Sequence, residues 1–325
     1  MNWPQNVPKT GPVQWRTENQ RNGARFTVGN LANSLINLNS LSRVNPVLIA
    51  GPTASGKSAL ALEIAAYTGG VIVNADALQV YDGWEILTAR PSAHDLTQAD
   101  HRLYGHVSYR DSYSAGAWQR DVMAILKEIE NPIIIGGTGL YFSALMQGMS
   151  LIPTTPPEVR SAGDALLAAE GAQALLQELD ADTLARIDQL NPARVQRAWE
   201  VQRTTGRGLA AWHDETPPPL LTLDTVTAFV MDADKTWLNA RIDQRFDAML
   251  EAGALEEAAR MERDWDPARA SSKAIGAPEL IAHLRGAMTL DEAREKSKIA
   301  TRQYAKRQRT WFRSKMKDWT PIALG

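Results

Sequence analysis

The sequence predicts an α/β fold in which a parallel sheet is flanked by helices and carries a helical insertion. Short apolar runs rich in β-branched residues lie at 47–50, 71–74 and 133–135, and each is followed by small residues and then a helical pattern. This succession is typical of βα units, whose strands are parallel because helices connect them. A further strand pattern at 225–234 follows a long helical stretch, so the sheet resumes after an insertion.

The first predicted strand ends in a glycine-rich turn. Gly51, Gly56, Lys57 and Ser58 match the pattern G-x-x-x-x-G-K-[ST], with a strand before it and a helix after it. The fold is therefore predicted to be of the P-loop NTPase type. Backbone N–H groups of residues 53–58 can face phosphate oxygens, the Lys57 ammonium can neutralise phosphate charge, and the Ser58 hydroxyl can bind Mg²⁺.

The turn predicts a diphosphate site without identifying the ligand. The predicted diphosphate-binding residues are Gly51, Pro52, Thr53, Ala54, Ser55, Gly56, Lys57 and Ser58. Because such a turn contacts phosphates and no base or sugar, ATP, GTP or another diphosphate could occupy it. The alternative is a glycine-rich turn that binds nothing.

An acid follows the second predicted strand. Asp76 lies just beyond residues 71–74, and the carboxyl end of this strand faces the same crevice as the phosphate turn in a doubly wound sheet. A carboxylate there could hold Mg²⁺ or take a proton from an acceptor substrate, as in kinases of small molecules. A strand-end aspartate that only caps the next turn is the alternative.

Composition divides the chain into three parts. Residues 1–44 are polar and rich in Asn and Pro, so we expect a poorly ordered N-terminal extension. Residues 45–150 and 216–325 form the predicted catalytic core, with long helices at 235–263 and 290–317. Residues 151–215 are rich in Ala and Leu and have no strand pattern, which predicts the helical insertion.

The totals exclude several classes of protein. A chain of 325 residues that is 44% hydrophobic can bury the core of one large domain or about two. The absence of cysteine excludes disulfides, thiolate zinc sites and a cysteine nucleophile. No apolar run reaches the roughly 18 residues of a membrane span, and the N-terminal residues lack the apolar core of a secretory signal. We therefore expect a cytoplasmic protein with no membrane partner.

The last predicted helix is strongly basic although the chain carries a net charge of −2. Residues 294–317 include ten Lys or Arg and one acid, a local charge of +9 (ten minus one). On a helix, five of the basic residues fall within an arc of roughly 80°, with Ala300, Tyr304 and Trp311 about opposite and predicted to pack. These five, the basic stripe, are Arg302, Lys306, Arg309, Arg313 and Lys317. The stripe suits a nucleic-acid backbone, and a merely solvated face is the alternative.

Six segments, in matching order, resemble the tRNA dimethylallyltransferase family. They are GPTASGKS (51–58), NADALQVYDGWEILTARP (74–91), IIIGGTGLYFSAL (133–145), ARIDQRFDAML (240–250), KAIGAPEL (273–280) and TRQYAKRQRTWFR (301–313). The resemblance runs from about residue 47 to 312. It implies transfer of a dimethylallyl group from its diphosphate to N6 of adenosine 37, beside the tRNA anticodon. The lack of cysteine makes the chain similar to the bacterial form, without a zinc finger.

The resemblance also implies roles for individual residues. Asp76 is similar to the family's general base, which takes the proton from a weakly nucleophilic exocyclic amine. Arg245 and Thr53 match donor-site residues, and Arg245 would hold the leaving diphosphate together with Lys57 and Mg²⁺ near Ser58. A solvated helix arginine and a plain loop hydroxyl are the alternatives for Arg245 and Thr53.

The predicted RNA contacts come from the same resemblance. The target base must leave the stack of the anticodon loop, and the insertion would clamp the anticodon stem. The residues implied are Asp76, Ala77, Leu78, Gln79, Thr138, Arg160, Ala193, Arg194, Val195, Gln196, Arg197, Lys273 and Gly276. Ala77 departs from the family, which usually has Ser there, so one hydroxyl is missing from the implied adenosine pocket.

Three other functions are compatible with parts of the pattern. A small-molecule kinase would use the same turn and acid to bind ATP. A nucleotide-regulated RNA-binding module would have no transfer chemistry. A prenyltransferase acting on free adenine nucleotides would have little use for the basic stripe or the arginines of the insertion. We expect the favoured enzyme to be a monomer that binds a tRNA anticodon stem-loop, dimethylallyl diphosphate and Mg²⁺.

Overall fold

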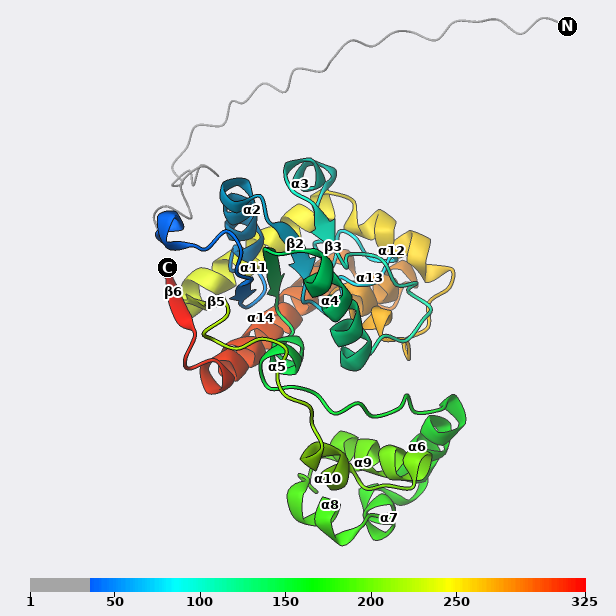
Figure 1. Ribbon diagram of the computed structural model, residues 1–325. Coiled ribbons are helices and arrows are strands. Elements are labelled where there is room, and N and C mark those ends of the chain that lie inside the picture. Colours follow the sequence, from blue (N-terminus) through cyan, green and yellow to red (C-terminus); the bar gives the residue numbers. More distant parts are fainter. Residues whose placement is uncertain (1–35) are drawn as a thin grey trace, which may run out of the picture.

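The computed structural model describes residues 36–325 and contains one six-stranded parallel sheet (Figure 1). The strand order is β3-β2-β4-β1-β5-β6. The strands are β1 (Val47–Ala50), β2 (Val71–Asn74), β3 (His101–Arg102), β4 (Pro132–Gly136), β5 (Thr227–Ala233) and β6 (Thr320–Leu324). The predicted α/β class is confirmed. Most of the predicted N-terminal extension, residues 1–35, lies outside the described part.

Thirteen α-helices and two 3-10 turns surround or extend the sheet in the described residues. The helices are α2 (Lys57–Thr68), α3 (Ala93–Gln98), α4 (Ala115–Glu128), α5 (Gly139–Met146), α6 (Pro157–Glu170), α7 (Ala172–Gln177), α8 (Ala181–Arg186), α9 (Pro192–Thr205), α10 (Leu209–Asp214), α11 (Lys235–Glu251), α12 (Ala254–Glu262), α13 (Ala277–Leu284) and α14 (Leu290–Lys315). The 3-10 turns are η1 (Leu38–Ser40) and η2 (Ser271–Lys273). Within this part of the chain, none of the helices is both long and apolar enough to cross a membrane.

Alternation along the strands builds a core on each face of the sheet. Leu48 of β1 packs on one side with residues of α4, α5 and the C-terminal end of α14. Ile49, the next residue, packs on the other side against α2. Successive strand residues point to opposite faces, and both faces are covered, so the strands are apolar throughout. β1 therefore lies at the centre of the sheet, with β4 and β5 as its neighbours.

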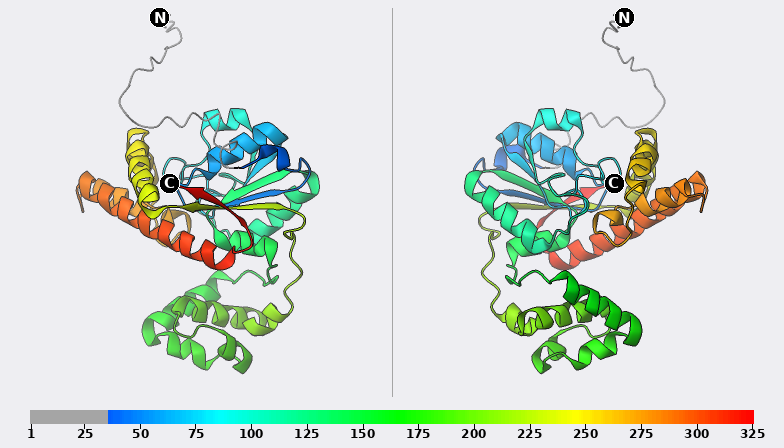
Figure 2. Two further views of the ribbon diagram at one scale, coloured as in Figure 1. Left: turned by 90° about the vertical axis from the view of Figure 1, so that its left-hand side faces the viewer. Right: turned by 90° about the vertical axis from the view of Figure 1, so that its right-hand side faces the viewer.

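The helical insertion of the predicted fold is present as α6–α10, a bundle beside the sheet-containing part (Figures 1 and 2). It has a core of its own, built on residues such as Leu175, Val195 and Trp199. Two connections join it to the sheet. They touch each other, because the hydroxyl oxygens of Ser150 and Thr216 lie 2.7 Å apart.

Two predicted boundaries differ from the structure. The helix predicted at 235–263 is two helices, α11 and α12, because Gly253 between them has a φ of 102°. That left-handed conformation ends a helix and is favourable mainly for glycine. The packed part of the chain also begins before residue 45, since Leu41 is buried against the α2 face of the sheet.

The edge strand β6 was not predicted. It pairs with β5 in parallel, with Met231 beside Ile322, and so returns the chain to the sheet after α14. Its sequence, TPIAL, contains a proline and only five residues. Such a short run carries little strand pattern, and a proline is tolerated because the strand lies at the edge.

Candidate functional site

The phosphate turn connects β1 to α2 and depends on two glycines. Gly56 has a φ of 91°, and it caps the N-terminus of α2. A Cβ atom on Gly51 would lie 2.7 Å from Cγ of Met231, so only glycine fits where the turn leaves the sheet. Ala54 also has positive φ, 63°. The turn is therefore held in the curved shape that aims N–H groups at an anion.

Two of the N–H groups predicted to face phosphate are used inside the protein. The Thr53 N–H donates to Oε1 of Gln308 on α14, at 2.9 Å, and the Ser55 N–H donates to the carbonyl of Pro52, at 3.3 Å. The prediction that every N–H of residues 53–58 faces phosphate is corrected for these two. The N-terminus of α2, which begins at Lys57, remains the anion-facing end of the turn.

The cationic side chains predicted for the diphosphate lie beside the turn. Arg245 of α11 donates from Nη1 to Oγ1 of Thr53, at 3.2 Å, so these two residues meet as the family resemblance implies. Burial lowers the pKa of the Lys57 ammonium to about 8, although the Asp76 carboxylate raises it and Arg245 lowers it further. Burial also lowers the pKa of Arg245, but a guanidinium stays charged in proteins.

Asp76 is positioned by the strand ends around it. Asn74, which is fully buried at the end of β2, accepts the Asp76 N–H at 2.8 Å and donates to the Asp76 carbonyl at 3.0 Å. Oδ1 of Asp76 accepts the Leu78 N–H at 3.0 Å. A Cβ on Gly137 would lie 3.3 Å from Oδ2 of Asp76. One carboxylate oxygen is thus held by the backbone, and the other lies close to the glycine pair that follows β4.

A cavity joins the turn, the acid and the arginine. Its polar lining includes Thr53, Asp76 and Arg245, which come from three separate segments. The rest of the lining is largely apolar and comes from the phosphate turn, the chain after β2, α11, the loop before α13 and α14. These residues are Ala54, Leu78, Leu87, Thr88, Ile242, Phe246, Met249, Ile275, Thr301 and Tyr304. A pocket with a charged part and apolar walls can hold a diphosphate that carries a hydrocarbon group.

Two predicted RNA contacts also hold the site together. The Thr138 hydroxyl accepts the Ala77 N–H at 2.9 Å, which ties the loop after β4 to the loop after β2. The Gln79 amide donates to the carbonyls of Thr88 and Ala89, at 2.8 and 2.9 Å. Both N–H groups of the Gln79 side chain therefore form hydrogen bonds within the protein. Whether any of these residues contacts RNA stays a prediction.

The predicted segment 273–276 lies on the far side of the cavity. Lys273 is exposed, whereas Gly276 is buried with a φ of 96°. A Cβ on Gly276 would lie 2.9 Å from the ring of Phe246 and 3.1 Å from Cδ2 of Leu87. Glycine is required here because a side chain would push into the wall of the cavity.

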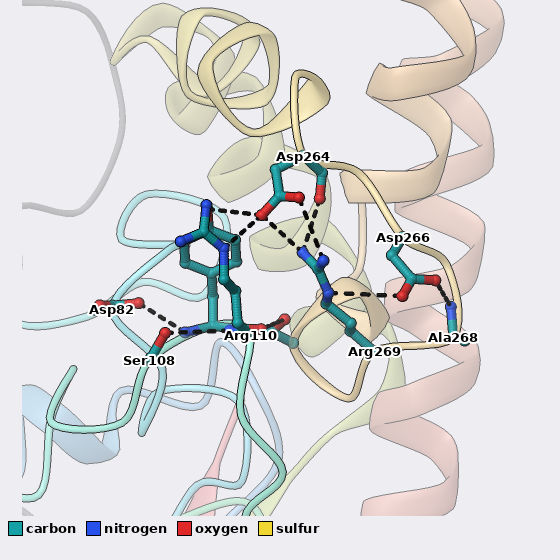
Figure 3. A network of polar contacts seen from close by, with 9 residues as sticks. Asp82, Ser108, Arg110, Asp264, Asp266, Ala268 and Arg269 are labelled. Atoms are coloured by element: carbon teal, nitrogen blue, oxygen red, sulfur yellow. Dashed lines mark hydrogen bonds and ion pairs between the residues drawn. The ribbon is translucent and has the colours of Figure 1, made fainter.

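A polar network anchors the chain that leads into this segment (Figure 3). Asp264 accepts hydrogen bonds from the Tyr109 hydroxyl, from Arg110 and from Arg269 at 2.7–3.0 Å. The hydrogen bonds from Arg269 and Arg110 hold the pKa of Asp264 well below its usual range. The Ser271 hydroxyl also donates to the Tyr109 carbonyl, at 2.6 Å. The loop after β3 and the loop after α12 are therefore fixed to each other.

In the insertion, two predicted RNA-binding arginines share one buried carboxylate. Glu200 has no exposed side-chain surface, and its Oε2 lies 3.2 Å from Arg160 and 3.9 Å from Arg197. Arg197 also donates to the Thr155 hydroxyl, at 2.7 Å. The side chain of Arg160 is 61% exposed, so its guanidinium reaches the surface.

The remaining predicted residues of the insertion differ in exposure. Ala193 and Arg194 are exposed at the start of α9. Gln196 donates to Asp164, at 2.6 Å, and to Glu200. Val195 is fully buried in the core of the insertion, so its side chain cannot be a surface contact. Arg194 is the predicted residue whose side chain is freest to reach a ligand.

The basic stripe of α14 does not lie opposite the packed face as predicted. The buried positions of α14 include Ala305, Gln308 and Phe312, and the stripe borders them. Arg302 forms an ion pair with Asp243 of α11, and Arg313 pairs with Asp232 of β5 at 3.2 Å. The packed face was placed wrongly because α14 buries three polar residues, Ser297, Lys298 and Gln308. Two of the five stripe residues therefore form ion pairs with the protein's own acids.

Gln308 is a site residue that the sequence did not single out. Its side chain is 5% exposed; Oε1 accepts the Thr53 N–H, and Nε2 donates to the Gly137 carbonyl at 2.9 Å. One amide thus joins α14 to the phosphate turn and to the glycine pair near Asp76. The helical pattern of residues 290–317 gave no signal for Gln308, because a glutamine on a helix is usually exposed.

The fold and the site define an α/β protein with a phosphate-turn motif beside a carboxylate. A family model described as IPP transferase matches residues 79–315, and one described as Isopentenyl transferase matches residues 44–110. The chain belongs to the IPP transferase family, as the six segments of its sequence indicated. It is thus an enzyme of the isopentenyltransferase family.

Relatives and solved structures agree with this assignment. A tRNA dimethylallyltransferase of Cereibacter sphaeroides is 62% identical over 86% of this chain and 96% of its own length. One of Ruegeria sp. is 58% identical over 89% and 99%. The crystal structure of a tRNA isopentenylpyrophosphate transferase from Bacillus halodurans is similar, with a TM-score of 0.62, 30% identity and coverage of 86% and 90%. A eukaryotic dimethylallyltransferase acting on tRNA, at 24% identity and a TM-score of 0.73, shows the same fold.

Proposed function

We propose that this enzyme transfers a dimethylallyl group from dimethylallyl diphosphate to N6 of adenosine 37 in the anticodon loop of tRNA. The cavity carries the proposal, because it brings Asp76 and Arg245 to the phosphate turn and adds walls made of apolar side chains. A nucleoside triphosphate would need polar contacts to its sugar and base rather than these walls. The relatives that match nearly their whole length are named for transfer of this group.

In the proposed reaction, Asp76 acts as the general base. The N6 amine attacks C1 of the dimethylallyl group, the bond between C1 and the diphosphate oxygen breaks, and Asp76 takes the N6 proton. A base in this position contributes about 10²- to 10⁴-fold to the rate. Asn74 fixes the backbone of Asp76, and the Leu78 N–H donates to one oxygen of its carboxylate, so the position of the base does not depend on the substrate.

The leaving diphosphate is neutralised by the residues of the turn. Lys57 and Arg245 supply positive charge, and Thr53 is held by Arg245 next to them. The hydroxyl of Ser58 is exposed at the N-terminus of α2 and forms no hydrogen bond with the described residues. Ser58 is thus a residue that would hold Mg²⁺ beside the phosphate turn. The ion would supply charge to the leaving group.

The RNA would reach Asp76 with its target base turned out of the stack. Lys273, Arg160 and Arg194 are exposed on the segments that the family resemblance assigns to tRNA. They are proposed to bind phosphates, because their side chains reach the surface on the insertion and near the cavity. Ala77 offers no hydroxyl to the adenosine, so Asp76 is the main polar partner of the adenosine in this segment. Placement in the cytoplasm and a monomeric state remain predictions.

The test is a transfer reaction with dimethylallyl diphosphate, Mg²⁺ and unmodified tRNA. Nuclease digestion followed by mass spectrometry should find one dimethylallyl group on an adenosine of the anticodon loop. Labelled free AMP in a parallel reaction should stay unmodified. Modification of AMP but not tRNA would favour the enzyme of free nucleotides, and ATP consumption without prenyl transfer would favour a kinase.

A further inference from the structure

A buried carboxylate of α12 holds a turn beside the cavity. Glu257 is 2% exposed. Its Oε1 accepts the N–H groups of Glu85 and Ile86 at 2.6 and 2.9 Å, and its Oε2 accepts the Leu87 N–H at 3.0 Å. No lysine, arginine or histidine of the described chain forms an ion pair with Glu257. A buried, unpaired carboxylate is unfavourable unless hydrogen bonds compensate for it, so the three N–H groups are what this side chain is built to bind.

The same turn is also held by the segment that carries Asp76. Gln79 donates to the carbonyls of Thr88 and Ala89, and the Thr88 hydroxyl donates to the Trp84 carbonyl at 2.5 Å. Ala89 has a positive φ of 52°, a conformation that a non-glycine residue keeps only when its surroundings fix it. The turn at residues 85–89 is therefore rigid, although it has no regular secondary structure.

This turn forms an apolar wall of the cavity. Leu87 and Thr88 line it together with Phe246, Met249 and Ile275. The close approach of Leu87 and Phe246 to Gly276 closes the wall, because a Cβ at Gly276 would lie 2.9 Å from the Phe246 ring, which is nearer than packing allows. Thr53 and Arg245 lie in the charged part of the same cavity. A hydrocarbon chain on a diphosphate bound at Arg245 would lie in the cavity that this wall bounds.

We propose that the turn at residues 85–89, held by Glu257, sets the length of the allyl group that the enzyme accepts. This inference rests on the proposed function. Glu257 does not touch the substrate and acts as a positioning residue: its hydrogen bonds keep Leu87 in the wall. A five-carbon group fits in front of a fixed wall, and a ten-carbon group meets Leu87. A rigid wall that clashes with a longer chain discriminates between two donors more strongly than a loose pocket that only loses contact with one methylene.

The test compares kcat/KM for dimethylallyl diphosphate and geranyl diphosphate with one unmodified tRNA. The wild-type enzyme should prefer the five-carbon donor by at least about 100-fold. Glu257→Gln keeps the size but places an NH₂ group against backbone N–H donors, so the wall loosens and the preference should fall at least about tenfold. Leu87→Ala opens the wall directly and should have the same effect, so it decides the question if Glu257→Gln does not fold. Glu256→Gln, an exposed neighbour on the same helix, is the matched control.

The outcomes separate the inference from the function it rests on. A lower preference in Glu257→Gln and Leu87→Ala, with Glu256→Gln within about twofold of wild type, supports the inference. An unchanged preference in the folded variants overturns it, even if kcat falls or the melting temperature drops. A changed KM for tRNA with an unchanged preference also overturns it, because the wall would then face the adenine. No transfer from either donor by the wild-type enzyme would reject the proposed function, and this inference with it.

Discussion

At the scale of residues, the site is built from a few side chains that each hold a neighbour in place. Asn74 holds Asp76, Arg245 holds Thr53, and Gln308 holds the phosphate turn. The meeting of Lys57, Asp76 and Arg245 at one site was predictable, because a motif or a family segment identified each of them. Gln308 and Glu257 were not predictable, since their partners are more than 150 residues away in the sequence. Only the fold shows which backbone groups a buried polar side chain meets.

Asp76→Asn tests the general base. The amide keeps the shape of the carboxylate but cannot take a proton, so single-turnover transfer should fall by about 10²- to 10⁴-fold. Affinity for tRNA, measured by filter binding, should stay within about twofold of wild type, because the change leaves the surface of the insertion intact. Asp318→Asn, an exposed carboxylate outside the site, should be as active as wild type. Normal single-turnover chemistry with weakened tRNA binding would reject the assignment.

The pH dependence of donor binding tests Lys57. Its pKa, lowered mainly by burial to about 8, lies below the usual 10.5, so the ammonium is charged below about pH 8 and neutral above it. Loss of one positive charge should weaken binding of the diphosphate, and KM for the donor should rise as pH increases through about 8. Arg245 stays charged over this range and cannot produce the change. A KM that stays constant up to pH 9.5, about 1.5 units above that pKa, would contradict this role.

At the scale of elements, α14 joins parts of the site that the sequence keeps far apart. Its buried face carries Gln308, Phe312 and Ala305 against the sheet and α11, while Tyr304 and Thr301 line the cavity. The helix itself was predictable from its length and pattern. Its orientation was not, because the predicted packed face was chosen from Ala300, Tyr304 and Trp311, whereas the buried face includes the polar residues Ser297 and Gln308.

Gln308→Met tests this link between elements. Methionine fills a similar volume but leaves the Thr53 N–H and the Gly137 carbonyl without partners, and leaving a buried polar group unpaired costs about 1–3 kcal/mol. The free energy of unfolding in urea should fall by about that amount, and KM for the donor should rise. Gln303→Met changes an exposed glutamine of the same helix and serves as the control. Equal stability and equal KM in the two variants would refute the link.

At the scale of the whole molecule, the insertion gives the enzyme a second surface. The helices α6–α10 have their own core and are joined to the sheet by two connections that touch each other (Figure 2). The helical nature of this part was predictable from its Ala- and Leu-rich pattern. The edge strand β6 and the break between α11 and α12 were not, because a five-residue strand and a single glycine leave little periodic signal.

Salt dependence tests whether the insertion binds the RNA backbone. Arg194→Gln should weaken tRNA binding and lower the slope of log K against log salt by about 0.7 to 0.9, the value for one phosphate contact. Arg203→Gln, on the same helix, should not change the slope, because Arg203 already faces Glu178 and the ring of Trp199. The same slope in wild type and in Arg194→Gln would show that Arg194 makes no phosphate contact.

The measurement that tests the account most directly is the stoichiometry of diphosphate release with tRNA present. If the phosphate turn binds the diphosphate of an allylic donor, each modified adenosine should release one diphosphate from dimethylallyl diphosphate. ATP supplied in the same reaction should remain intact. Hydrolysis of ATP at the turn, with dimethylallyl diphosphate left unconsumed, would contradict the account.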